Sequence, residues 1–308
     1  MARSYRYLHY DVFTDHLFGG NQLAVVLDGR GLSGHTMQAI AKEMNFSETT
    51  FVLPPETAGT DVRMRIFTPG EELPTAGHPT IGTTFALART GVIDCGRPSM
   101  VFGCGIGPVP VTMTWAGDDL AFAWMSQLLP TFGEVIPDPA RAAAALSLSP
   151  AAVAGTGHPV QIVSCGVPFL FVPLTTRSAV DSVTINAGVL DSLLASANAS
   201  ANATAHGVFV FTAQPGDARA TVYSRMFAPE MGITEDPATG IASGPLGCYL
   251  VRHKIVRPEK ADAMISLQGV KMGRPSRVHI SIGVENGDIT SVRVGGESVL
   301  AGEGTLYL

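Results

Sequence analysis

An internal duplication limits the fold of this chain more than any other feature. Residues 51–81 (FVLPPETAGTDVRMRIFTPGEELPTAGHPTI) align without a gap with residues 211–241 (FTAQPGDARATVYSRMFAPEMGITEDPATGI), at a constant offset of 160 positions. Eight of the 31 aligned positions are identical, where roughly two are expected from average residue usage. Self-similarity of this kind indicates two related halves.

Both copies contain the same order of predicted elements: a strand, a turn with Pro or Gly, a second strand, a long turn and a helix. The alternating stretch 61–67 leads to a helix near 80–90, and the stretch 220–227 leads to a helix near 241–254. Both helices carry small and apolar residues all round, which is typical of a buried helix. The sequence therefore predicts an α/β (α+β) fold of two pseudo-repeated halves.

The loops before the two helices, TAGHPT (75–80) and EDPATG (235–240), occupy equivalent places in the two halves. A helix N-terminus presents unpaired backbone N–H groups and about half a positive charge. Two such helix starts facing one cleft would form an anion site.

Each half also contributes one carboxylate that the other lacks. Glu48 aligns with Val208, and Asp236 aligns with Ala76. We therefore expect a cleft between the halves that holds two acids from different walls.

The bulk composition limits the class of protein and its partners. A chain of 308 residues is long enough for two domains of about 150 residues each. The net charge of −6 and the pI near 5.7 argue against nucleic acid or an anionic membrane as a partner. The N-terminal stretch 1–13 lacks the apolar segment of a signal peptide, and the four cysteines form no CxxC motif. A reduced, cytoplasmic setting without a metal site is the expectation.

The chain carries five ordered motifs: FGGNQLAVVLD, NFSETTFVLPP, FTPGEELPTAGHPTIGT, RMFAPEMGITEDPATGIASGPLGCYL and QGVKMGRPSRV. Together they resemble the PhzF-like isomerases of phenazine biosynthesis, within the diaminopimelate epimerase fold. The resemblance implies two similar halves, each a curved, mostly antiparallel sheet around a central helix, with the site at their junction. It also implies a homodimer that works on a small anionic carboxylic acid without metal or organic cofactor. The expected halves are residues 1–118 plus about 292–308, and residues 119–291.

The same resemblance assigns catalytic roles. It places the general acid/base at Glu48, a proton relay or hydrogen-bond partner at His78, and an assisting carboxylate at Asp236. The residues themselves also allow a surface carboxylate at Glu48, a packed histidine at His78, and an ordinary helix start at Asp236 with Pro237.

Four further positions are expected to bind the substrate. Asn21 would orient it, although its amide could instead support the turn after Gly19 and Gly20. The backbone N–H groups of Gly77 and Gly240 would hold the substrate carboxylate, although either glycine could only relieve a turn. Ile241 stands where the family usually has a serine that contacts the substrate, and Gln22 stands where the family usually has a proline. Loss of that hydroxyl is expected to change the preferred substrate.

Three functions follow from these features. The leading one is an isomerase, similar to trans-2,3-dihydro-3-hydroxyanthranilate isomerase, that moves a proton between carbons of a small cyclic or unsaturated acid. An epimerase or racemase is the second, although the loops before the two helices carry no cysteine of the kind used by two-thiol epimerases. A non-catalytic binding protein on the same scaffold is the third.

Overall fold

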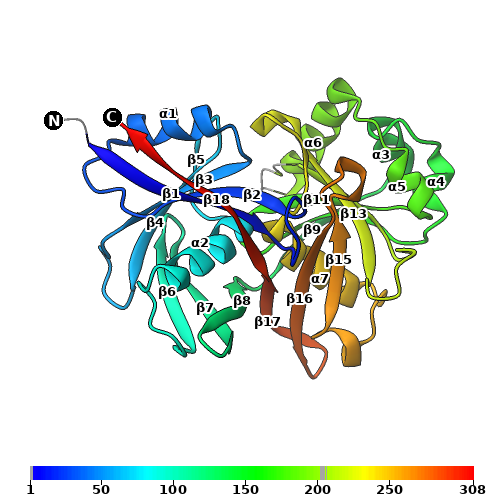
Figure 1. Ribbon diagram of the computed structural model, residues 1–308. Coiled ribbons are helices and arrows are strands. Elements are labelled where there is room, and N and C mark those ends of the chain that lie inside the picture. Colours follow the sequence, from blue (N-terminus) through cyan, green and yellow to red (C-terminus); the bar gives the residue numbers. More distant parts are fainter. Residues whose placement is uncertain (1–2, 202–204, 206) are drawn as a thin grey trace. The chain divides into compact units, whose positions relative to one another are not determined.

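The computed structural model describes residues 3–201, 205 and 207–308, and the chain forms two compact units (Figure 1). Unit 1 contains residues 1–126 and 294–308, and unit 2 contains residues 127–293. The mixed α/β class expected from the sequence is confirmed.

Unit 1 is a sheet with one central helix and one outer helix. The strands follow the spatial order β18-β1-β2-β3-β4-β6-β7-β8, and only the β2/β3 and β4/β6 pairs are parallel. The short strand β5 pairs with β4. The strands are β1 (Ser4–Val12), β2 (Asn21–Val26), β3 (Glu48–Leu53), β4 (Val62–Phe67), β5 (Glu72–Leu73), β6 (Ser99–Cys104), β7 (Gly107–Ala116), β8 (Asp119–Gln127) and β18 (Ser298–Tyr307), and the helices are α1 (Gly34–Met44) and α2 (Gly77–Arg89).

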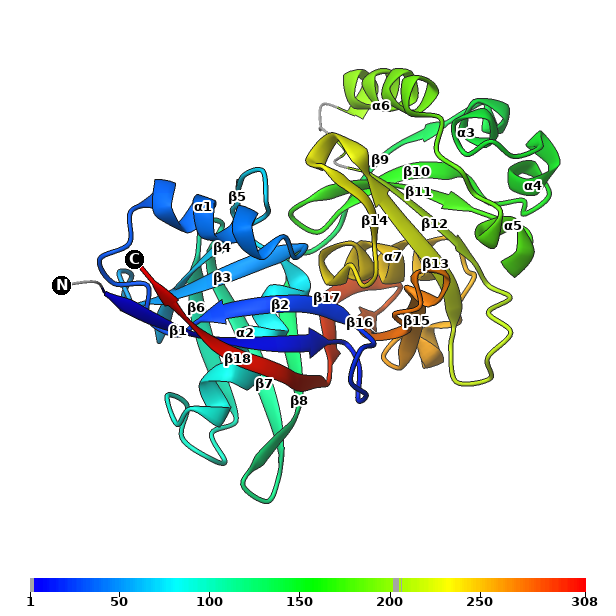
Figure 2. The ribbon, with the colours of Figure 1, turned by 45° about the horizontal axis from the view of Figure 1, so that its top comes forward.

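Helix α2 is the core of unit 1. Every residue from Gly77 to Leu87 is buried, and the helix packs against β1, β2, β3 and β18. Figure 2 shows β1, β2 and β18 passing in front of α2. The helix comes close to the sheet at Gly82, where a Cβ atom would lie 2.6 Å from Leu23 Cδ2 and 2.7 Å from Val12 Cγ2.

Unit 2 has the same sequence of pairings. Strands β10/β11 are antiparallel, β11/β12 parallel, β12/β13 and β13/β14 antiparallel, β13/β15 parallel and β15/β16 antiparallel. The strands are β9 (Thr131–Ile136), β10 (Val160–Ser164), β11 (Pro168–Pro173), β12 (Val208–Thr212), β13 (Val222–Ala228), β14 (Ile233–Asp236), β15 (Met264–Gln268), β16 (Ser276–Glu285) and β17 (Asp288–Gly296), the helices are α3 (Pro139–Ala145), α4 (Pro150–Ala154), α5 (Arg177–Asp181), α6 (Ala187–Ala201) and α7 (Gly240–Arg252), and the 3₁₀ turns are η1 (Pro229–Met231), η2 (Pro258–Lys260) and η3 (Val270–Met272).

The central strands of unit 2 are covered on both faces. Alternate side chains of β11 and β12 belong to two different apolar clusters. One cluster includes residues of α3 and α6, and the other includes residues of α7. Strands buried on both faces read as continuous apolar runs, which explains the sequences PFLFVP and VFVFT.

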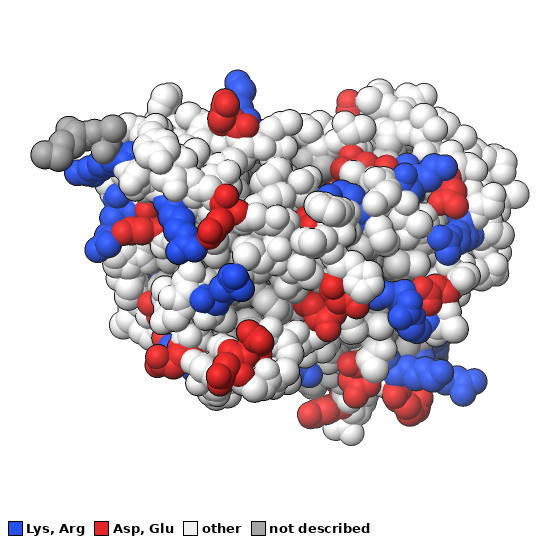
Figure 3. Space-filling view, in the orientation of Figure 1, with Lys and Arg blue, Asp and Glu red and all other residues white. Residues whose placement is uncertain are grey.

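Acidic and basic side chains are interspersed over the face shown in Figure 3, with wide areas that carry neither. Within residues 3–201 and 207–308, no helix combines the length and the apolar character that a membrane crossing requires.

The close approach at Gly82 yields a stability prediction. We expect Gly82→Ala to lower the free energy of unfolding by about 1–3 kcal/mol, because the added methyl group overfills the contact between α2 and the sheet. The matched control is Gly188→Ala in α6, where an added Cβ meets no atom within 4 Å. There, better helix propensity should leave stability equal or raise it by up to about 1 kcal/mol. Urea unfolding of both variants measures the difference, and equal stabilities would contradict the packing argument.

Candidate active site

Glu48 is the first residue of β3, and its side chain faces α2. Helix α1 ends at Met44, and Asn45 is its C-cap. The left-handed conformation of Asn45 (φ 52°) turns the chain toward β3. Alternate residues of a strand point to opposite faces. Thr50 contacts Thr83 of α2, with 2.9 Å between the hydroxyl oxygens, whereas Phe51 packs in the apolar cluster beneath α1. Glu48 lies on the same face as Thr50, so its carboxylate is directed to the first turn of α2.

Three buried polar side chains meet at this turn. The Nε2 atom of His78 lies 3.1 Å from Oε2 of Glu48, and its Nδ1 atom lies 3.2 Å from Nδ2 of Asn21. The exposed fractions are 8% for Glu48, 3% for His78 and 1% for Asn21. The structure therefore brings Asn21, His78 and Glu48 together, and His78 is the middle member.

The turn before Asn21 requires glycine. Gly20 has φ +61°, and a Cβ atom there would lie 2.3 Å from the backbone oxygen of Val12. Only glycine fits such a position without a clash. The conformation at Gly20 sets where β2 begins, and hence where the Asn21 amide meets His78.

Burial keeps His78 neutral. Removal of the imidazole from water lowers the pKa of His78 to about 3, because the protein interior disfavours the charged form. A hydrogen bond with the backbone of Gln22 opposes this shift, but burial dominates. The Nδ1 atom of this neutral ring contacts the Asn21 amide, and the Nε2 atom is the ring nitrogen that lies near Glu48.

Asp236 is the last residue of β14, and it is also buried. Its Oδ2 atom accepts a hydrogen bond from the hydroxyl of Thr239 at 2.5 Å. Helix α7 begins at Gly240 after Thr239, so the alternative that Asp236 and Pro237 form an ordinary helix start is wrong. The chain from Asp236 to Thr239 instead forms a polar turn before the helix.

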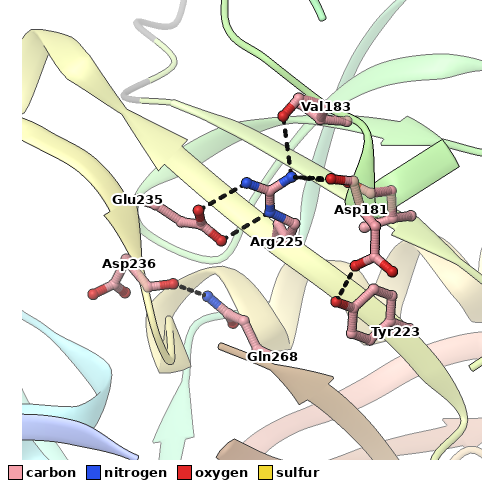
Figure 4. Close-up of polar contacts among 8 residues, drawn as sticks. Asp181, Val183, Tyr223, Arg225, Glu235, Asp236 and Gln268 are labelled. Carbon is pink, nitrogen blue, oxygen red and sulfur yellow. Dashed lines mark hydrogen bonds and ion pairs between the residues drawn. The ribbon is translucent and has the colours of Figure 1, made fainter. Parts of the chain in front are cut away.

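Gln268 holds this turn from the end of β15. Its Nε2 atom donates to the backbone oxygen of Asp236 at 2.8 Å and to the Thr239 hydroxyl at 2.9 Å, while its Oε1 atom accepts from the Thr239 amide at 3.1 Å. Figure 4 shows the bond to Asp236. Sequence reasoning assigned no role to Gln268 or Thr239. The available signal was a single amide at the end of the apolar run MISLQ.

The remaining expected positions lie at the two helix starts. Gly77 and Gly240 are the first residues of α2 and α7, and neither helix has a side-chain hydrogen bond at its N-cap. Ile241 is half-buried and packs against the apolar cluster around α7. The hydroxyl of Ser243, two residues after Ile241, donates to the Thr239 backbone oxygen at 2.9 Å. This hydroxyl is therefore paired with the backbone at the start of α7.

The arrangement in unit 1 is suited to proton transfer. A buried carboxyl group within 3.1 Å of an imidazole is a common general acid/base arrangement. In unit 2, Asp236 is held by Thr239 and Gln268. The expectation that Glu48 and Asp236 act in one cleft stays a prediction.

The low pKa of His78 predicts how stability depends on pH. Below pH 6.5 the unfolded chain binds a proton at this histidine and the folded chain does not, until the pH approaches about 3. The free energy of unfolding should therefore fall with decreasing pH, by about 1.4 kcal/mol per unit from this group. We expect His78→Gln to flatten the slope between about pH 6.5 and 4.5, measured by urea unfolding. The exposed His35 is the control, since His35→Gln should keep the wild-type slope. Equal slopes in wild type and His78→Gln would refute the assignment.

Comparisons with known proteins agree with the sequence motifs. The sequence model of the phenazine biosynthesis-like protein family (PhzC-PhzF) matches residues 10–304. An uncharacterised isomerase of Mesorhizobium japonicum is 36% identical over 303 residues, 98% of each chain. The trans-2,3-dihydro-3-hydroxyanthranilate isomerase of Pseudomonas aeruginosa is 35% identical over 305 residues, 99% of this chain and 100% of that protein.

A solved structure gives the same result. The PhzF-family phenazine biosynthesis protein of Bacillus anthracis matches with a TM-score of 0.85 at 27% identity, covering 99% of this chain and 100% of that chain. The resemblance drawn from the motifs is confirmed, and the chain belongs to the phenazine biosynthesis-like protein family.

Proposed function

We propose that this protein is an isomerase that moves a proton between two carbons of a small cyclic or unsaturated carboxylic acid, with the Glu48 carboxyl as general acid and base. The observation that carries the proposal is the buried contact of 3.1 Å between Glu48 and His78. Proton transfer by a positioned side chain accelerates a reaction typically by about 10²–10⁴-fold.

The proposed reaction conserves atoms and charge within the substrate. The ionised Glu48 removes a proton from one carbon, and the electron pair of that C–H bond moves the double bond toward the substrate carboxylate. The protonated Glu48 then returns the proton to a second carbon. In this proposal the Nε2 atom of His78, 3.1 Å from the carboxyl group, and the Asn21 amide, 3.2 Å from Nδ1, keep the acid in one position through both steps.

The other residues bind the substrate in this proposal. The N–H groups of Gly77 and Gly240 bind its carboxylate, because helix N-termini favour anions. Asp236 binds an amino or hydroxyl group, and Ile241 supplies an apolar contact. The substrate named for the Pseudomonas aeruginosa relative is the first compound to assay. A cytoplasmic homodimer completes the proposal, and light scattering tests the dimer.

Deuterium incorporation tests the chemistry. Substrate incubated with the enzyme in deuterated water should gain label at the carbon that receives the proton. We expect Glu48→Gln to fold, because it keeps the size of the side chain, and to lose about 10²-fold or more in both turnover and labelling. Glu43→Gln, an exposed carboxylate of α1, is the matched control and should retain full activity.

The outcomes separate the candidate functions. A product with a shifted double bond supports the isomerase, and a product that differs only in stereochemistry identifies an epimerase. Unchanged turnover in Glu48→Gln would eliminate the mechanism. Thermal stabilisation by the acid without any labelling would identify a binding protein.

A further inference from the structure

Arg225 of β13 is a buried arginine with an unusually complete set of partners. Its Nε and Nη2 atoms each donate to one oxygen of Glu235 at 2.8 Å. Its Nη1 atom lies 3.0–3.2 Å from three backbone oxygens at the end of α5. The residue is only 7% exposed, and Figure 4 shows the guanidinium between Glu235 and that helix end. The three backbone oxygens belong to Val180, Asp181 and Val183.

This pair compensates for weak backbone pairing of β14. The strand has only four residues, and its register with β13 shifts between Met226, which faces Asp236, and Ala228, which faces Ile233. A shifted register leaves the backbone ladder locally disrupted. Glu235 lies inside the disrupted segment, so its bidentate bond to Arg225 fixes the strand where the ladder does not.

The pair also places one charge of each sign on the residue that precedes Asp236 and on its partner. Glu235 directly precedes Asp236 in the chain, and its side chain is 14% exposed, against 8% for the side chain of Arg225. An unpaired carboxylate at this depth would disfavour ionisation of its neighbour, and an unpaired guanidinium would favour it. Bound to each other, the two charges largely cancel.

The duplication supplies a counterpart in which a leucine, not an aspartate, follows the paired glutamate. In unit 1, Arg65 binds Glu72 through Nε and Nη2 at 2.6 and 2.5 Å. Each arginine also lies over a phenylalanine two residues on, Arg65 over Phe67 at 5.0 Å and Arg225 over Phe227 at 4.7 Å. Glu72 is followed by Leu73 and stands five residues before Gly77. The shared arrangement stabilises each sheet, and only the copy in unit 2 abuts a candidate site acid.

We propose that Arg225 and Glu235 are positioning residues for Asp236, which fix its place on β14 and keep the neighbouring charge neutral. The catalytic meaning of this inference rests on the proposed function, but its physical content does not. It predicts that removal of either partner changes the ionisation of Asp236, in opposite directions.

The test measures the titration of Asp236 by carbon NMR of labelled aspartate carboxyls in the full-length protein, with Asp236→Asn used to assign the signal. Glu235→Gln leaves the Arg225 cation unpaired and should lower the pKa of Asp236. Arg225→Gln leaves the Glu235 anion unpaired and should raise it. In the double variant the two shifts should largely cancel. Arg225→Lys keeps the positive charge but cannot form the bidentate bond. The pKa of Asp236 should therefore return close to its wild-type value, whereas the backbone order should recover less.

Backbone hydrogen exchange and kinetics provide the second readout. Glu235→Gln and Arg225→Gln should each increase the hydrogen exchange of backbone amides in residues 233–240. If Asp236 takes part in the reaction, turnover should also fall by roughly 10–100-fold, because a catalytic group displaced by about 1 Å costs a rate of that order. Glu72→Gln and Arg65→Gln are the matched controls, which should change neither the Asp236 titration nor exchange in 233–240.

Titration shifts in the same direction, or no shift in folded Glu235→Gln and Arg225→Gln, would overturn the inference. Opposite shifts with full activity in Asp236→Asn would keep the positioning role and exclude Asp236 from the chemistry. An active Glu48→Gln variant would refute the proposed function alone.

Discussion

A helix buried on every side leaves backbone groups without intrahelical partners only at its ends, and this constraint shapes both units. Helix α2 is buried from Gly77 to Leu87, and α7 is buried over most of its length. The surrounding strands accept side chains that are small or apolar, as the contact of Gly82 with Val12 and Leu23 shows. Polar chemistry is therefore concentrated at the helix starts, where backbone N–H groups lack partners within the helix.

The polar groups at the two helix starts have different arrangements. In unit 1 the first turn itself carries His78, which is matched by Glu48 from β3 and Asn21 from β2. In unit 2 the polar groups precede the helix, where Asp236 is matched by Thr239 and Gln268. Buried polar groups are stable only when they have polar partners. Each half therefore contains its own group of polar contacts, on the same arrangement of strands. The duplicated scaffold thus carries an asymmetric pair of sites.

The sequence drew attention to the two candidate acids but not to the residues that contact Asp236. Glu48 and Asp236 are conspicuous because the aligned position in the other half is apolar, and His78 stands in the motif before a helix. Gln268 and Thr239 gave no comparable signal, since an amide or hydroxyl has no recognisable pattern until the strand that carries it is placed. The helix expected near 241–254 starts at Gly240, whereas the alternative helix start at Asp236 was wrong, because an Asp-Pro pair also resembles a helix start.

By itself, the sequence determined the duplication, the two buried helices and the family, because these depend on residue periodicity and on motifs that are local in the chain. Only the tertiary structure decided which polar groups meet. The contacts of His78 with Glu48 and Asn21, and of Arg225 with Glu235 and the end of α5, join separate elements, some more than 40 residues apart in the chain. Hydrogen bonds require their atoms to approach within about 3 Å, and such distances are fixed by strand register and helix packing rather than by residue type.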